Sequence, residues 1–405
     1  MTDDASETAL KAAWELWHST AEDVRAAIEA SDRFQHDEAS RGAAYQSLLE
    51  AQAMAYNIAV APRRYMEHPR VFNQSTWHDN LLALGQPTQD FKYSGLFLDG
   101  RRTYHARVRR GESKLWLTQV HDKCLGDPES KEIGNYDYDD FTAGPDGTIE
   151  LVFSAEEHPG NWIRLAGDSP FNWLVMRRIM ADWTDDLGDF EFTSATPALP
   201  VDDPVVEAAE SIAAAAHLVR YLVTVFTIGL HSLYAARAGG LNAWATMPGA
   251  EVKDSLIGSR STVYVPAAFR IEPDEAIVIT WDVPQSAYWS FQLGDVWSRP
   301  LDYLNHQTDL NMNRAVPDAD GKVRVVVSLD DPGVPNWLDP CGRREGTIVM
   351  RNYRAAGDTT VPDLRVVKAA DVRGLLHPDT PACSAKQRAQ ALARRRTDAA
   401  ALVAQ

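Results

Sequence analysis

The chain has 405 residues, 45% hydrophobic and 24% charged, which fits a globular protein and excludes a disordered or fibrous one. Its 40 Lys and Arg against 57 Asp and Glu give a net charge of −17, so neither nucleic acid nor an anionic membrane is expected as a partner. The three cysteines lack C-x-x-C spacing, which favours a reducing compartment, the cytoplasm, over a disulfide frame or a zinc site.

Helices are predicted at the N-terminal end of the chain. Apolar residues recur at helical spacing over 6–57, with a break near Ser31–His36, and the N-terminal helical segment is expected to cover 1–90. The acidic first residues precede no apolar stretch, so no signal peptide is expected. The polar run Trp77–Asn80 is interpreted as a helix start capped by Asp79.

A first β-domain is predicted over 91–200, because the hydrophobic period becomes two from Phe91 onwards. Its strands are expected at Thr103–Val108, Leu115–Val120, Thr148–Phe153, Asn161–Leu165 and Trp173–Ile179. A helical pattern then begins at Pro204 and ends at Gly239, which predicts a helical connector within 201–260.

The connector contains Ser211–Leu230, a stretch long enough to cross a membrane. It carries His217 and Arg220 in its first half, and a charge inside a lone span costs roughly 2.5–3.5 kcal/mol. A buried helix is therefore predicted. Of the polar connector residues, His231 and Tyr234 are three apart and are expected to be neighbours.

A second β-domain is predicted over 261–368, followed by a C-terminal helical tail over 369–405. The tail is expected to form a Lys- and Arg-rich helix from Ser384 to Val403. Its basic face is interpreted as solvated.

The two β-domains match each other at an almost constant offset. The Trp, Gln and Asp of 115–122 recur in 288–295, and further matches pair 146–154 with 320–328, Asn161-Trp162 with Asn336-Trp337, and 175–177 with 349–351. Units of about 100 residues have the size of a β-sandwich or jelly roll. The predicted fold class is therefore α+β, with two duplicated β-sandwich or jelly-roll-like domains, N-terminal helices, a long connecting helix and a C-terminal helix.

Residues retained in both copies are expected to serve the shared fold. The expected core anchors are Trp116, Trp289, Trp162 and Trp337. Bonds to backbone at turns are expected from Gln119, Gln292, Asn161 and Asn336. The arginines Arg177 and Arg351 are expected to form ion pairs with Asp122 and Asp295.

The second half of the chain resembles a known family. Tyr288-Trp289-Ser290, Asn336-Trp337-Leu338 and Met350-Arg351-Asn352-Tyr353 look like the bacterial domain of unknown function 1214, over roughly 261–383, and the first half resembles it only weakly. The chain departs from the family at Asp339-Pro340-Cys341, where a small or proline-rich stretch is usual. The resemblance implies the fold and assigns no catalytic residue or cofactor.

The two copies differ most in the polar loop that follows the strand at 288–294. Tyr303 and His306 are the predicted proton-transfer residues, and Arg299 is predicted to hold an oxyanion. The predicted ligand-binding residues are Tyr288, Gln292, Trp297, Asp302 and Asp309. His306 and Asp309 lack an evident third ligand, so neither a metal nor another cofactor is expected.

Twelve Trp, 13 Tyr and 12 Phe favour a cavity for an apolar or ring-shaped ligand. Motifs of serine hydrolases, zincins, phosphate-loop enzymes and dinucleotide enzymes are absent from the sequence. The first hypothesis is a cofactor-independent lyase, isomerase or hydrolase that acts on a hydrophobic or polycyclic small metabolite in the second β-domain. The alternative is a non-catalytic protein that binds such a small molecule or a carbohydrate. The sequence leaves open the substrate, whether the chain forms a homo-oligomer, and which β-domain carries the site.

Overall fold

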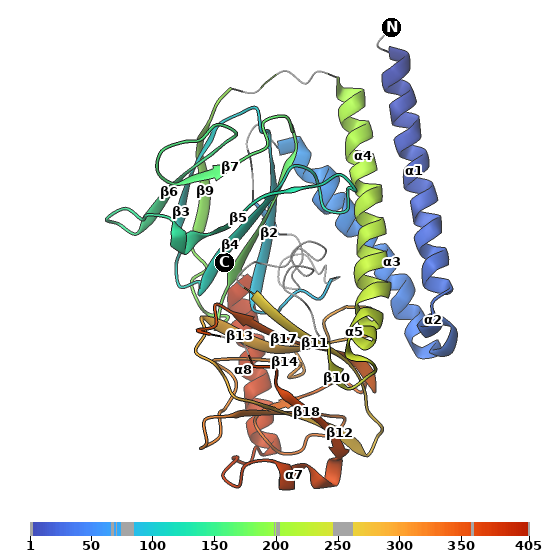
Figure 1. The fold of residues 1–405 in the computed structure, drawn as a ribbon, viewed down its shortest axis with the longest axis vertical. Helices are drawn as coiled ribbons and strands as arrows, with labels where there is room; N and C mark the ends of the chain where they lie inside the picture. Colours follow the sequence, from blue (N-terminus) through green and yellow to red (C-terminus); the bar gives the residue numbers. More distant parts are fainter. Residues whose placement is uncertain are drawn as a thin grey trace. The chain divides into compact units, whose positions relative to one another are not determined.

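The computed structural model describes residues 3–65, 69, 71–73, 85–197, 199, 203–245, 262–357 and 360–403, and the run Trp77–Asn80 lies outside them. Contacts divide the chain into two compact units, each with one β-sandwich (Figure 1). The first unit contains residues up to Gly85, Phe91–Met180 and Asp186–Ile228. The second contains Gln86–Asp90, Ala181–Asp185 and the chain from Gly229 onwards.

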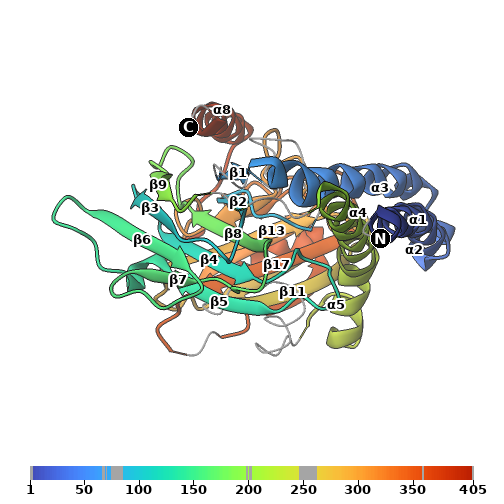
Figure 2. The ribbon, with the colours of Figure 1, turned by 90° about the horizontal axis from the view of Figure 1, so that it is seen from above.

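The first unit contains the N-terminal helices, which the sequence predicts, and the long helix of the connector. They are α1 (Asp3–Glu29), α2 (Asp32–His36), η1 (Glu38–Ser40), α3 (Arg41–Ala55), η2 (Tyr56–Val60), η3 (Ala61–Tyr65) and α4 (Pro204–Tyr221). Asp203 caps α4, since its carboxylate accepts the backbone N–H of Val205 at 2.9 Å and Pro204 occupies the first turn. Both α1 and α3 pack against α4 (Figure 2).

The backbone of α4 continues through the π-helical turn η5 (Leu222–Gly229) into α5 (Leu230–Ala238). The helix ends where predicted, at Gly239, whose φ of 75° is a left-handed conformation that glycine adopts without strain. By length and apolar composition alone, one helix among the described residues could cross a membrane, Pro204–Ala238. In the structure, 44% of its most apolar window is buried.

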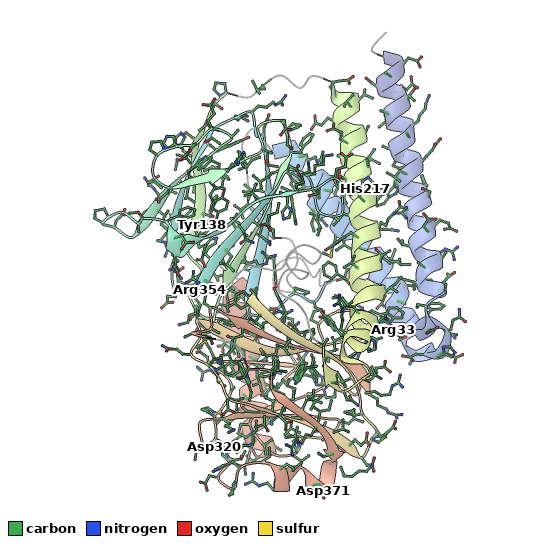
Figure 3. The ribbon with its side chains drawn as sticks, in the orientation of Figure 1. Arg33, Tyr138, His217, Asp320, Arg354 and Asp371 are labelled. Carbon is green, nitrogen blue, oxygen red and sulfur yellow. The ribbon has the colours of Figure 1, made fainter. Side chains whose placement is uncertain are left out.

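The first sandwich has two facing sheets, with strand orders β1-β2-β8-β4-β5 and β7-β6-β3-β9. Its strands are β1 (Phe72–Asn73), β2 (Phe91–Leu98), β3 (Tyr104–Arg109), β4 (Leu115–His121), β5 (Glu132–Asp137), β6 (Thr148–Ser154), β7 (Trp162–Arg164), β8 (Asn172–Ile179) and β9 (Asp189–Ala195), with the turn η4 (Tyr138–Asp140) after β5. Tyr138, labelled in Figure 3, belongs to the core of this sandwich. Trp116 stacks on it, with ring centroids 5.2 Å apart.

The second sandwich repeats this plan with strand orders β10-β11-β17-β13-β14 and β16-β15-β12-β18. Its elements are β10 (Ala243–Trp244), β11 (Thr262–Arg270), β12 (Glu275–Trp281), β13 (Tyr288–Gly294), β14 (Asp309–Asn311), β15 (Val323–Ser328), β16 (Trp337–Leu338), β17 (Glu345–Tyr353), β18 (Asp363–Lys368), η6 (Ala369–Asp371), α7 (Val372–Leu375) and α8 (Ala385–Val403). The parallel pairs β6–β7 and β15–β16 are also equivalent. The predicted α+β fold with a duplicated β-domain is confirmed.

The shared asparagines, Asn161 and Asn336, and the tryptophans that follow them make the same contacts in both copies. The side-chain N–H groups of Asn161 donate to the carbonyls of Thr142 and Glu150, and those of Asn336 donate to the carbonyls of Val316 and Arg324. The indole N–H of Trp162 donates to the Ser154 carbonyl at 3.1 Å, and that of Trp337 to the Ser328 carbonyl at 3.0 Å. Trp116 and Trp289 are buried in their cores.

The predicted ion pairs of Arg177 and Arg351 with Asp122 and Asp295 are wrong. The Nη1 of Arg177 donates to Gln119 Oε1 at 2.6 Å, and the Nη1 of Arg351 donates to Gln292 Oε1 at 2.7 Å. The register explains the difference, because each glutamine lies diagonally across the ladder on the same face as its arginine.

The interpretation of the basic face of the C-terminal helix α8 as solvated holds for the exposed Lys386, Arg394 and Arg396, but it is wrong for two other arginines of the helix. Arg388 and Arg395 are 7% and 6% exposed, because seven residues make about two turns and place both on the face that packs on the second sandwich. The Nε of Arg388 bonds Asp331 at 3.0 Å, and Arg395 bonds Asp309. Burial of these charges depends on carboxylates far away in the sequence.

Candidate functional site

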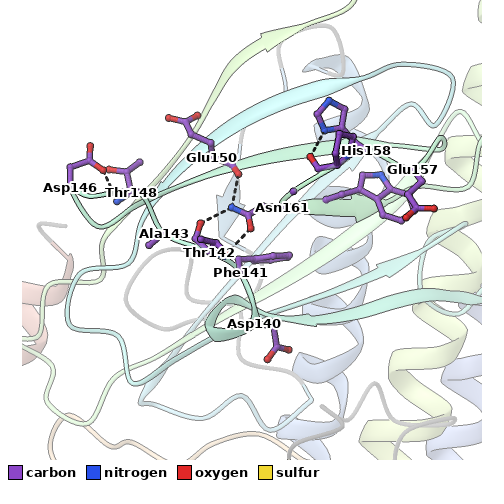
Figure 4. A pocket seen from close by; sticks show the side chains of 14 residues that line it. Asp140, Phe141, Thr142, Ala143, Asp146, Thr148, Glu150, Glu157, His158 and Asn161 are labelled. Carbon is purple, nitrogen blue, oxygen red and sulfur yellow. Dashed lines mark hydrogen bonds between the residues drawn. The ribbon is translucent and has the colours of Figure 1, made fainter.

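A pocket of about 860 Å³ opens at one end of the first sandwich, between the loop that precedes β6 and the loop that joins β6 to β7 (Figure 4). Asn161 ties the two loops together, because its side chain also accepts the backbone N–H of Thr142 at 2.9 Å. The Asp146-Gly147 turn leads into β6, and the Asp146 carboxylate accepts the Thr148 N–H at 3.0 Å. Local turn chemistry therefore shapes this pocket.

The pocket is acidic. Its lining includes the carboxylates Asp140, Asp146, Glu150 and Glu157, and no lysine or arginine is among the described residues that line it. The backbone N–H of Thr148 lowers the pKa of Asp146, which keeps that carboxylate charged at neutral pH. A positively charged ligand would thus be attracted and an anion repelled.

Trp162 supplies an aromatic surface within the same pocket. Its ring is half-buried, and the bond from its indole N–H to Ser154 fixes its orientation. An indole face held next to carboxylates can bind a cation through the ring and through charge at the same time.

In the second sandwich, the equivalent surface is covered by the C-terminal segment of the same chain. Val334 packs with Val372 and Leu376 of the segment that includes α7. The backbone N–H of Cys383 donates to the Gly333 carbonyl at 2.7 Å. One copy of this surface is therefore filled by protein, while the other forms an open pocket.

A buried charged network lies in the second unit. Asp90 and Asp309, whose side chains are 1% and 2% exposed, share the guanidinium of Arg314, and Asp309 also bonds Arg395. Trp183 lies under both arginines, with its ring centroid 5.2 Å from Arg314 Cζ and 4.8 Å from Arg395 Cζ. The charges are thus paired and shielded from solvent, as buried ions must be.

Neutral donors complete the bonds to Asp90. They are the hydroxyl of Tyr288 at 2.6 Å, the side-chain N–H of Asn311 at 3.0 Å and the indole N–H of Trp183 at 2.8 Å. Burial and the adjacent Asp90 raise the pKa of Tyr288 well above its usual range, so this phenol stays protonated as a donor. With every oxygen of Asp90 occupied, the network favours a structural role over chemistry.

The acid stability of the protein is expected to depend on Asp309. Burial alone would raise its pKa, but Arg395 and Arg314 outweigh burial and lower it. A folded-state pKa below the unfolded value of about 3.9 contributes stability above that pH, which is lost as the pH falls through the folded-state value. Unfolding midpoints measured between about pH 2 and 6 should therefore depend less on pH in Asp309→Asn, and an unchanged slope would contradict this.

His306 lies in a second polar cluster of the same unit. Its Nδ1 is 2.7 Å from Asp339 Oδ2, and its side chain is 41% exposed. Cys341 completes the cluster, and ligand atoms of the three residues lie within 4.8 Å of one another. This set can orient a histidine as a base or supply N, O and S ligands to a metal ion such as zinc. From the sequence, His306 and Asp309 lacked a third metal ligand. The structure instead groups His306 with Asp339 and Cys341, and Asp309 is not part of this group.

The thiol of Cys341 is not an activated nucleophile. Burial and the adjacent Asp339 raise its pKa to about 12, and burial raises the pKa of Cys124 to about 12. With iodoacetamide at neutral pH, we expect Cys383 to be alkylated first, as measured by mass spectrometry of peptides. Modification of Cys341 at the same rate as Cys383 would show that the thiolate is stabilised.

The structure separates the residues that the sequence grouped into one site. Tyr288, Asp309 and the backbone carbonyl of Tyr303 all contact the buried network, the last through Arg395 Nε at 2.9 Å. The other predicted residues have local partners: Gln292 bonds Arg351, Trp297 is fully buried, Arg299 donates its backbone N–H to Asp295, and Asp302 accepts the N–H groups of Leu304 and Asn305. Their roles toward a ligand stay predictions.

Sequence reasoning missed the pocket residues Glu157 and Trp162 as a site. Trp162 was assigned to the core because it recurs as Trp337, and the recurrence is real. A signal that could have distinguished the two tryptophans lies after each copy. Only the second copy is followed by a helix with arginines seven residues apart, which can cover the surface around Trp337.

The structure defines a protein with two tandem β-sandwiches, each flanked by helices. The family described as protein of unknown function (DUF1214) matches residues 86–181 and 270–357, so the likeness extends to both halves and not mainly to the second. No curated protein matches the chain.

Two solved structures are similar to this chain. An uncharacterized protein from Burkholderia cenocepacia is 27% identical, with a TM-score of 0.78, over 90% of this chain and 99% of that one. A protein from Vibrio parahaemolyticus is 14% identical, with a TM-score of 0.44, over 79% of this chain and 99% of that one. The first likeness extends over the helices as well as the sandwiches.

Proposed function

We propose that this protein is a non-catalytic binding protein and that the pocket of the first sandwich receives a small cationic molecule. The observation that carries the proposal is the difference between the copies. The same surface is filled by the chain's own C-terminal segment in the second sandwich and is an open, acidic pocket in the first.

The chemistry of the pocket supports a cation over the uncharged hydrophobic ligand expected from composition. Four carboxylates line it, and Trp162 offers one ring face. Glu150 is paired with Arg107 at 2.9 Å, but a purely apolar molecule would desolvate the other three carboxylates without giving them a charged partner, which costs free energy. A cation with a flat or apolar part would satisfy both the charges and the ring.

Binding is expected to depend on Trp162. We expect saturable quenching of tryptophan fluorescence by organic cations, and at least about tenfold weaker binding in Trp162→Ala. Trp14→Ala is the control, because that ring is 54% exposed on α1 and does not line the pocket. Neutral sugars that bind through Trp162 in place of cations would favour a carbohydrate-binding protein. Saturation by neither class would contradict the proposal.

Catalysis in the second sandwich is a second candidate, supported by the 2.7 Å contact between His306 and Asp339. In this version His306, oriented by Asp339, accepts a proton from a hydrophobic metabolite. Turnover found in a metabolite screen should disappear in His306→Ala with little loss of stability. A matched change at the exposed His36 should leave turnover intact, and activity retained in His306→Ala would end this candidate.

A further inference from the structure

Resting on the proposed binding function, we propose that the ligand of the first pocket is a guanidinium group, held as Arg388 is held in the second sandwich. Arg388 lies over the Trp337 ring, with Cζ 5.2 Å from the ring centroid. Its Nε bonds Asp331 at 3.0 Å, and its Nη2 donates to the Val334 carbonyl at 2.5 Å. Its Nη1 also donates to Gln307 Oε1 at 2.9 Å and to the Pro335 carbonyl at 3.3 Å. The ring, the carboxylate and the Val334 carbonyl are three of the acceptors around this planar cation, an arrangement that suits the several in-plane donors of arginine.

The first sandwich repeats these three acceptors. Trp162 corresponds to Trp337, and both rings are fixed through equivalent serine carbonyls. Glu157 lies three residues after Ser154, as Asp331 lies three residues after Ser328. Pro159 precedes Asn161 by two residues, as Val334 precedes Asn336.

All three counterparts line the open pocket: Trp162, Glu157 and Pro159. Three of the acceptors that hold Arg388 in the second sandwich therefore have counterparts in the first, and these counterparts form part of the wall of a pocket.

No arginine of the described chain takes the place of Arg388 in the first sandwich. Arg107 bonds Glu150 at 2.9 Å and is not among the residues that line the pocket. Glu157 makes no ion pair with any residue that the structure describes. The Pro159 carbonyl oxygen lies 2.9 Å from His158 Nδ1, and a carbonyl has a second lone pair for another donor. The Glu157 carboxylate and the Trp162 ring are thus open to a guanidinium from outside the chain, and the Pro159 carbonyl can accept one further bond.

The path of the chain explains why the first copy is open. The long helix that comes after β18, beyond the short η6 and α7, is α8, which brings Arg388 to its sandwich. The long helix that follows β9 is α4, and it packs against α1 and α3 instead. The surface of the first sandwich therefore retains these acceptors, but no long helix among the described residues covers it, because α4 packs on α1 and α3.

The test compares N-acetyl-arginine amide with N-acetyl-lysine amide, which carries the same charge without the planar set of donors. Titration of the full-length protein by calorimetry should show at least about tenfold tighter binding of the arginine compound. Trp162→Ala and Glu157→Gln should each weaken this binding at least tenfold. Glu156→Gln is the matched control, because Glu156 is exposed next to Glu157 and does not line the pocket.

The outcomes separate this inference from the proposed function. Equal affinity for the two compounds, or an equal effect of the Glu156 and Glu157 changes, would overturn the guanidinium assignment and leave a general cation pocket. Absence of binding by any cation would contradict both. A peptide with the sequence of residues 381–396 distinguishes the sources: tighter binding than the amide assigns the ligand to an arginine-bearing peptide, and equal binding assigns it to a free guanidinium compound.

Discussion

Replacing Asp309 by alanine is expected to lower the free energy of unfolding by about 3–5 kcal/mol, because it leaves Arg395 buried without a carboxylate. Arg314 keeps Asp90 as its partner, so the loss falls mainly on α8. Denaturant unfolding followed by circular dichroism measures the change.

The control for Asp309 is Asp282→Ala. Asp282 forms a 3.0 Å pair with Lys322, but its side chain is 70% exposed, so its loss should cost less than about 1 kcal/mol. The double variant Asp309→Ala with Arg395→Met should lose less than the sum of the two single changes, because the orphaned charge is gone. Strict additivity, or similar losses in Asp309→Ala and Asp282→Ala, would contradict a structural role for the network.

Trp337→Ala is expected to cost about 3–5 kcal/mol, since it removes a large side chain that is 8% exposed. The change also removes the ring under Arg388, so α8 should be released from the sandwich and its amide protons should exchange faster.

The same change at Trp162 should cost less, because that ring is half-buried at the edge of the pocket. A melting temperature that Trp337→Ala leaves unaltered would show that the indole is dispensable. Comparison of the two variants therefore measures how much stability the tryptophan gains where the C-terminal segment packs on it.

The sandwich strands and the duplication could be predicted because both depend on local patterns. Alternation in Thr103–Val108 and the recurrence of Asn161-Trp162 as Asn336-Trp337 indicate strands and turns without knowledge of any long-range contact. The contacts of Asn161 and Asn336 then agree atom for atom.

The buried charges could not be predicted in this way. Arg395 resembles a solvated helix residue until Asp309 is placed beside it, 86 residues earlier in the chain. Asp90 and Trp183 carry no motif, and their role exists only when Arg314 joins them. The pocket of the first sandwich could not be predicted from sequence patterns either, because it exists only where no later segment of the described chain packs on that surface.

The division of the chain has a consequence for dissecting the protein. Gln86–Asp90 and Ala181–Asp185 belong to the second unit, although they directly precede β2 and follow β8 of the first. A gene fragment that begins at Gly229 would encode a second sandwich without Asp90 and Trp183, and so with Arg314 deprived of one carboxylate. A single cut between the two sandwiches therefore cannot yield an intact second unit, because two of its segments lie on either side of the first β-domain.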